Sequence, residues 1–164
     1  MNSFNITFNF KYASNLVDLT WRDILFGINN GFFSPEVAIE NAISEITSKE
    51  EKSDLVFQIA QLFKGESIHP FIDELVSNES RNEADSTAKF LYILLNWLYE
   101  NRNKYDNWME MIWNIYLDFH SPEEIYELIP YVSPEKYDRV APLDIYILTK
   151  WKEYLDEKSL YYKS

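Results

Sequence analysis

The feature that most constrains the fold is an uncharged stretch, FLYILLNWLY, from Phe90 to Tyr99. It contains no glycine and no proline, and on a helix its apolar side chains would point in every direction. A helix that is apolar all round is expected to be buried on all sides. Ten residues rise about 15 Å, half of what a bilayer requires, so we predict a core helix from about 83 to 101 and not a membrane span.

Caps and apolar spacing predict further helices around this central one. Thr20 is a good N-cap with Asp23 at the third helical position, and Gly31 suits the left-handed residue after a helix. Other predicted helices span about 34–46, 54–64, 68–77, 105–119 and 121–129, with a short turn near 133–135 and a last helix from 142. The apolar residues expected to face inward include Phe63 and Ile145. We therefore predict an all-α fold in a single domain, residues 1–164, of mainly antiparallel helical hairpins, with a short solenoid as a possible arrangement.

The N-terminal segment allows two interpretations. Phe4, Ile6, Phe8 and Phe10 alternate with polar residues, which is the period of a half-buried strand. A short helix beginning near Phe8 fits as well, since Tyr12 and Leu16 would follow on the same face. We favour the short strand or extended arm.

The bulk composition excludes several classes of function. The formal net charge is −12, with 27 acidic and 15 basic residues, which opposes binding to nucleic acid and to anionic membranes. There are no cysteines, so disulfides and thiolate metal sites are excluded, and a reducing cytoplasm fits. The first residues lack a basic region followed by an apolar run, so no signal peptide is predicted.

No constellation of side chains predicts catalysis, a cofactor or a metal. Glu66 and His69 form one E-x-x-H motif, whereas a di-metal bundle needs two and further carboxylates. The chain has only three glycines, so it offers no phosphate-cradling loop. We expect a protein that is not an enzyme, with no catalytic, cofactor-binding or metal-binding residues.

Two acidic clusters are the candidate partner-binding residues. The preferred run from 118 to 127 contains four acids and no base, and it follows the segment that carries Trp108, Trp113 and Tyr116. An aromatic anchor beside charge is typical of tight interfaces. The alternative cluster lies between 73 and 79, and a merely solvated acidic face remains the other explanation of both. The candidates are Asp118, Glu123, Glu124 and Glu127, then Asp73, Glu74 and Glu79.

The segment LTWRDILFG at 19–27, followed by GFFSPE at 31–36, resembles a bacterial domain-of-unknown-function family of small acidic helical proteins. The resemblance is clearest over about residues 16–45. Proteins of this type are associated with polymorphic toxin systems as immunity proteins. The resemblance implies helical structure and a toxin partner, and it supplies no catalytic residues.

Three hypotheses of function remain open. The first is an immunity protein that binds and neutralises a cognate toxin in the cytoplasm, such as a basic nuclease-type domain whose cleft an acidic surface would block. The second is a helical interaction or scaffold domain without a toxin partner. The third, an enzyme, lacks any predicted site.

Overall fold

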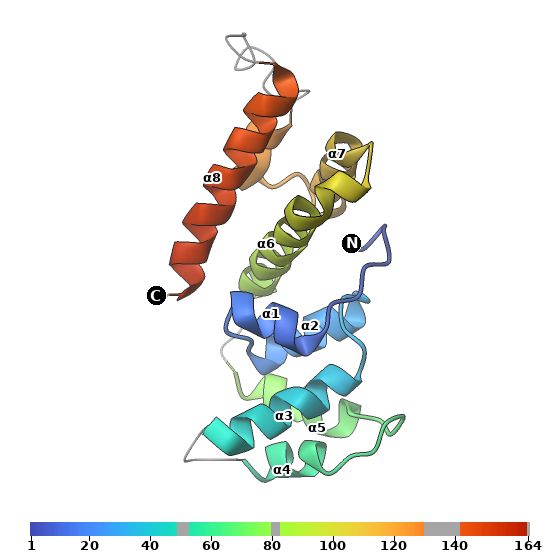
Figure 1. Cartoon of the computed structure of the whole chain (residues 1–164). Coiled ribbons are helices and arrows are strands. Elements are labelled where there is room, and N and C mark those ends of the chain that lie inside the picture. Colours follow the sequence, from blue (N-terminus) through green and yellow to red (C-terminus); the bar gives the residue numbers. More distant parts are fainter. Residues whose placement is uncertain (49–52, 80–82, 130–141, 164) are drawn as a thin grey trace. The chain divides into compact units, whose positions relative to one another are not determined.

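The computed structural model describes residues 1–48, 53–79, 83–129 and 142–163. Every regular element in these ranges is a helix (Figure 1). The predicted all-α class is therefore confirmed, and the described residues contain no strand. The chain divides into two compact units, an N-terminal unit, Asn2–Ser86, and a C-terminal unit, Thr87–Ser164. The single domain over 1–164 and the solenoid arrangement stay predictions.

The N-terminal unit contains α1 (Phe10–Leu16), α2 (Trp21–Asn29), α3 (Glu36–Ser48), α4 (Asp54–Ala60), α5 (His69–Ser77) and the start of α6 (Glu83–Asn101). Helix α3 packs against α4, α4 packs against α5, and α2 contacts both α3 and α5. The apolar residues of these helices form the core of the unit. Its buried members include Ile24, Phe32, Ala38, Ala42, Ile59 and Ile72.

The N-terminal segment is neither a strand nor fully helical. Asn9 caps α1 by accepting a hydrogen bond from the backbone N–H of Tyr12, and residues 5–9 before it have no regular structure. The backbone N–H of Phe8 donates to the carbonyl of Phe32 at 2.8 Å, and the two rings stack. The preferred strand is thus not found in residues 1–9, and the alternative helix begins at Phe10. Buried rings, the bond to Phe32 and side-chain hydrogen bonds from Asn2 and Thr7 to the carbonyl of Gly31 hold this segment, without a sheet ladder.

Two predicted inward residues in the helices are exposed instead. Helix α4 ends at Ala60, earlier than predicted, so Phe63 lies beyond it and is 78% exposed. In α8 (Leu143–Lys163), Ile147 is buried while Ile145 is 52% exposed. The predicted start of α8 near residue 142 is right, but its buried face is rotated from the predicted one.

The C-terminal unit holds most of α6, η1 (Arg102–Lys104), α7 (Trp108–Asp118), η2 (Glu123–Leu128) and α8. The uncharged stretch is buried as predicted from Phe90 to Leu95, six consecutive residues that cover every face of a helix. Further along the stretch, Asn96, Trp97 and Tyr99 are only partly buried.

Helices α6 and α8 of this unit run antiparallel. The ring of Tyr92 lies 5.3 Å from that of Tyr162, and the ring of Tyr99 lies 5.0 Å from that of Trp151. Residue numbers rise along α6 as they fall along α8, which fixes the opposite directions. Trp151 is fully buried and also stacks on Trp108 of α7, so one indole links three helices.

No helix in the described part of the chain is long and apolar enough to cross a membrane. The predicted turn near 133–135 lies outside the described residues.

Candidate functional site

The preferred acidic run lies where α7 ends and η2 follows it. Asp118 is the last residue of α7 and is half-buried, whereas Glu123, Glu124 and Glu127 lie on η2. Between the two helices, His120 and Ser121 both have positive φ, +61° and +57°. Two consecutive left-handed residues turn the chain sharply, so η2 leaves α7 in a new direction.

The short helix η2 is held by its apolar residues. Ile125 is 1% exposed and Leu128 is 3% exposed, while the three glutamates between and before them face solvent. The predicted regular helix over 121–129 is in fact this 3-10 turn, with non-helical backbone at Ile125. The buried pair fixes the turn, and the fixed turn positions the carboxylates.

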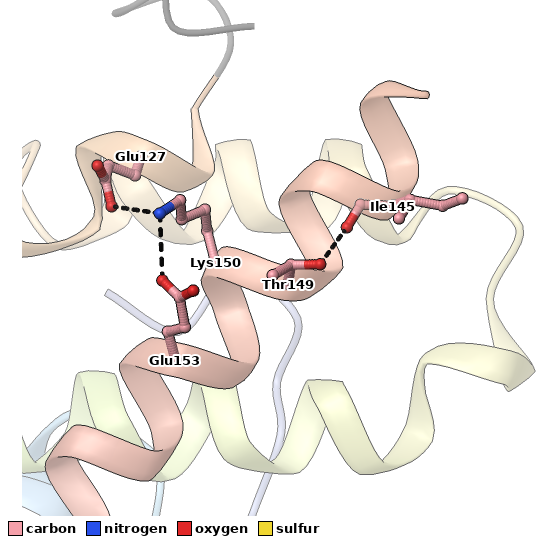
Figure 2. Close-up of polar contacts among 5 residues, drawn as sticks. All are labelled: Glu127, Ile145, Thr149, Lys150 and Glu153. Carbon is pink, nitrogen blue, oxygen red and sulfur yellow. Dashed lines mark hydrogen bonds and ion pairs between the residues drawn. The ribbon is translucent and has the colours of Figure 1, made fainter. Parts of the chain in front are cut away.

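Two lysines of α8 partly compensate the acidic run. The ammonium of Lys158 lies 2.9 Å from a carboxylate oxygen of Glu124. Lys150 donates to Glu153 at 3.2 Å and lies 4.0 Å from Glu127 (Figure 2). The hydrogen bond to Glu153, together with the nearby Glu127 carboxylate, raises the pKa of Lys150. The run has no base within its own sequence, but the fold supplies two from a helix more than twenty residues later.

The third glutamate of η2, Glu123, is exposed and has no ion pair within 4 Å among the described residues. It is therefore the glutamate of η2 that is most accessible to an external cation.

The alternative cluster is split by the fold. Asp73 and Glu74 lie exposed on α5, and Asp73 is 3.8 Å from His69 one turn earlier. Glu79 lies after α5, and its two carboxylate oxygens accept hydrogen bonds from the backbone N–H groups of Trp21 and Arg22, at 3.1 and 2.8 Å. Glu79 is therefore engaged in holding the start of α2, and the structure leaves Asp73 and Glu74 as the exposed part of this cluster.

Side chains accept hydrogen bonds from the backbone N–H groups at the start of α2. Thr20 and Asp23 form the reciprocal capping box, in which each side chain accepts from the other's backbone N–H. Together with Glu79 they accept from four successive N–H groups, which are the donors that a helix start leaves unpaired. The motif that carries the family resemblance is thus a structural device, as its composition of cap and core residues suggested.

A hollow of about 680 Å³ on the C-terminal unit was missed by sequence reasoning. Its described lining comes from the turn before α7 and its first residues, from the end of η2 and from the start of α8. These residues are Asp106, Asn107, Trp108, Met109, Glu110, Trp113, Leu128, Ile129, Leu143 and Ile147. One signal was available in the sequence: Met109 falls outside the apolar stripe of its helix, which indicates an exposed apolar side chain.

Within the described ranges, no group of three or more histidine or carboxylate side chains is placed to hold a metal ion. The described side chains of the acidic run and of the hollow offer charge, hydrogen bonding and aromatic contact to another molecule.

Comparison with models of protein families matches residues 10–159 to the family described as "Uncharacterized protein conserved in bacteria (DUF2247)". No curated protein and no solved structure matches the chain significantly. The expected membership in a bacterial family of unknown function is confirmed, while the link to toxin systems stays a hypothesis. Since the matched range begins at the first residue of α1 and reaches into the last turns of α8, the chain belongs to this family of uncharacterized proteins conserved in bacteria.

Proposed function

We propose that this chain is an immunity protein, a non-enzymatic binder that neutralises a cognate bacterial toxin domain in the cytoplasm. The binding surface in this proposal includes Asp118, Glu123, Glu124 and Glu127. The exposed acids of α5, Asp73 and Glu74, are the alternative surface.

The observation that carries the proposal is the presentation of three glutamates on η2, a turn held by two buried side chains. Ile125 and Leu128 anchor this turn, and the side chains of Glu123, Glu124 and Glu127 project from it to solvent. Acids held on a fixed turn lose little conformational freedom when a partner binds, so more of the interaction energy appears as affinity.

Charge supports a basic partner. The chain carries a net charge of −12, and acidic residues outnumber basic ones in both units. A toxin that cleaves nucleic acid needs a basic cleft, and an acidic protein would be steered to that cleft and would cover it. The side chains of the ion pairs Glu124–Lys158 and Glu127–Lys150 are 21–49% exposed, so a basic partner can reach these carboxylates and compete with the two lysines.

The test is protection of cells. We expect a gene directly upstream of this one to encode a protein that ends in a toxin domain. That toxin is expressed from an inducible promoter with and without this chain. Survival only in the presence of the chain supports the proposal. If protection is lost when Glu123, Glu124 and Glu127 are reversed to lysine, the toxin-binding surface includes the acidic run. A neighbouring toxin that kills equally with and without the chain contradicts the proposal and favours the scaffold hypothesis.

A further inference from the structure

The hollow on the C-terminal unit has an apolar floor and an accessible apolar edge. Leu128, Ile129 and Ile147 are buried, at 3%, 1% and 1% exposure, while Met109 and Leu143 are 37% and 42% exposed. A floor that is shielded and an edge that is open are what an inserted side chain needs.

Two indoles in the lining are held in place by other rings. Trp108 stacks on the fully buried Trp151 with 5.9 Å between ring centroids, and Trp113 stacks on Tyr116 at 5.6 Å. Rings fixed in this way lose little further freedom when another molecule binds. They make the hollow a preformed aromatic site.

The charged residues in the described lining of the hollow are all acidic. Asp106 and Glu110 are exposed members of the lining, and neither has an ion pair within 4 Å in the described part of the chain. The described lining residues include no lysine, arginine or histidine. Carboxylates beside indole faces match a guanidinium group, which pairs with carboxylates in a bidentate manner and stacks on aromatic rings.

We propose that this hollow anchors an arginine of the partner protein, together with an apolar side chain next to that arginine. A second copy of this chain is disfavoured as the occupant because it would bring a further net charge of −12 to an acidic rim. The identity of the partner as a toxin rests on the proposed function, but the arginine chemistry of the hollow does not.

The experiment uses the full chain labelled with 5-fluorotryptophan, whose five tryptophan signals are assigned by single Trp→Phe variants. The probes are two peptides, acetyl-Leu-Arg-Leu-amide and the same peptide with citrulline, which has the shape of arginine without its charge. We expect the arginine peptide to shift the Trp108 and Trp113 signals saturably and the Trp21 signal not at all. The citrulline peptide should bind about tenfold more weakly, which corresponds to one favourable cation–aromatic or ion-pair contact.

Three variants locate the effect. Asp106→Asn combined with Glu110→Gln should weaken the arginine peptide about fivefold or more and leave the citrulline peptide unchanged. The matched control, Glu40→Gln combined with Glu157→Gln, removes two exposed charges outside the hollow and should change binding by less than about twofold. Leu143→Lys, at an exposed edge position, puts a cation into the hollow and should abolish the difference between the peptides.

Several outcomes would overturn the proposal. Equal binding of both peptides, or no shift of Trp108 and Trp113, excludes arginine recognition. Signals of these two rings that change on dilution without peptide indicate a second copy, and rings that are silent to a soluble gadolinium chelate indicate that the chain itself fills the hollow. If the chain binds the arginine peptide but does not protect cells from a toxin, the arginine site is supported and the immunity function is contradicted. If the chain protects cells but does not bind the arginine peptide, the immunity function is supported and the arginine site is contradicted.

Discussion

The hydroxyl of Ser86 donates a hydrogen bond to the carboxylate of Asp23, with 2.6 Å between Oγ and Oδ1, and both side chains are only 1% exposed. This pair joins the start of α6 to the start of α2 inside the N-terminal unit. Ser86→Ala leaves a carboxylate oxygen buried without this donor, so we expect a loss of about 1.5–3 kcal/mol of unfolding free energy. Urea unfolding measures it, and Ser77→Ala, an exposed control, should change stability by less than about 0.5 kcal/mol. Equal losses in the two variants would show that the bond to Asp23 contributes nothing.

Glu79 is the second long-range contributor to the start of α2. Glu79→Ala removes the acceptor of two backbone N–H groups and a negative charge at the positive end of the helix dipole, so we expect a loss of about 0.5–2 kcal/mol. Glu74→Ala, which removes an exposed acid of α5, should stay within about 0.5 kcal/mol of wild type in the same denaturant titration. If neither variant changes the unfolding free energy, water replaces the Glu79 carboxylate at this helix end with no loss of stability.

The buried indole of Trp151 should carry more stability than the half-buried indole of Trp97. Trp151→Ala is expected to cost about 3–5 kcal/mol, because it removes a ring packed between Tyr99 and Trp108. Trp97→Ala should cost less, since its side chain is partly exposed. Calorimetric melting of the two variants gives the order, and the reverse order would contradict the described packing of α8.

The raised pKa of the Tyr154 hydroxyl predicts a loss of stability at high pH. Burial, followed by the nearby carboxylate of Glu124, raises the pKa of Tyr154 well above its usual value of 10. Above pH 10 the unfolded chain loses this proton while the folded chain keeps it, so the folded state becomes less stable as pH rises, by about 1.4 kcal/mol per pH unit at most. Tyr154→Phe should flatten this dependence, whereas Tyr161→Phe, at a 69% exposed position, should not. Identical stability curves for the two variants from pH 9 to 11.5 would contradict the prediction.

The acidic run predicts salt-dependent association with the proposed toxin. Reversing Glu123, Glu124 and Glu127 to lysine should slow association about tenfold at low salt, and the deficit should shrink as salt screens the charges. A control with the same change in net charge reverses the exposed residues Glu40, Glu100 and Glu157, which lie outside both candidate surfaces. Stopped-flow rates across a salt series distinguish the two triple variants. Equal slowing of both would assign the effect to net charge and not to η2.

The sequence predicted those parts of the fold that depend on neighbouring residues. The uncharged stretch predicted α6, and Thr20 with Asp23 predicted the start of α2, since caps and apolar periodicity act within a few residues. The predicted buried face of α8 was wrong at Ile145, because the elements that pack against a long helix decide which of its faces is buried. The N-terminal alternation suggested a strand, but the described residues of the unit contain no strand to pair with it, and the rings of Phe8 and Phe32 stack instead.

The candidate site was less predictable for the same reason. The sequence around Glu124 and Glu127 contains no lysine or arginine, and their lysine partners come from α8, which the fold alone brings near. Likewise, Glu79 looks like a surface acid until α5 and α2 are seen to meet. The hollow is assembled from three separated segments, so only Met109 hinted at it.

The side-chain caps of α2 also have a consequence for synthesis of the chain on the ribosome. The first backbone N–H groups of α2 find their acceptor in Glu79, and the buried Asp23 finds its donor in Ser86, some sixty residues later. A nascent chain that ends before Glu79 therefore has every residue of α1 to α5 but not the groups that complete the start of α2. A fragment that contains the N-terminal half by itself would have to extend through Ser86. In a chain truncated at residue 78, the backbone N–H groups of Trp21 and Arg22 would lack their Glu79 acceptor when α2 leaves the ribosome.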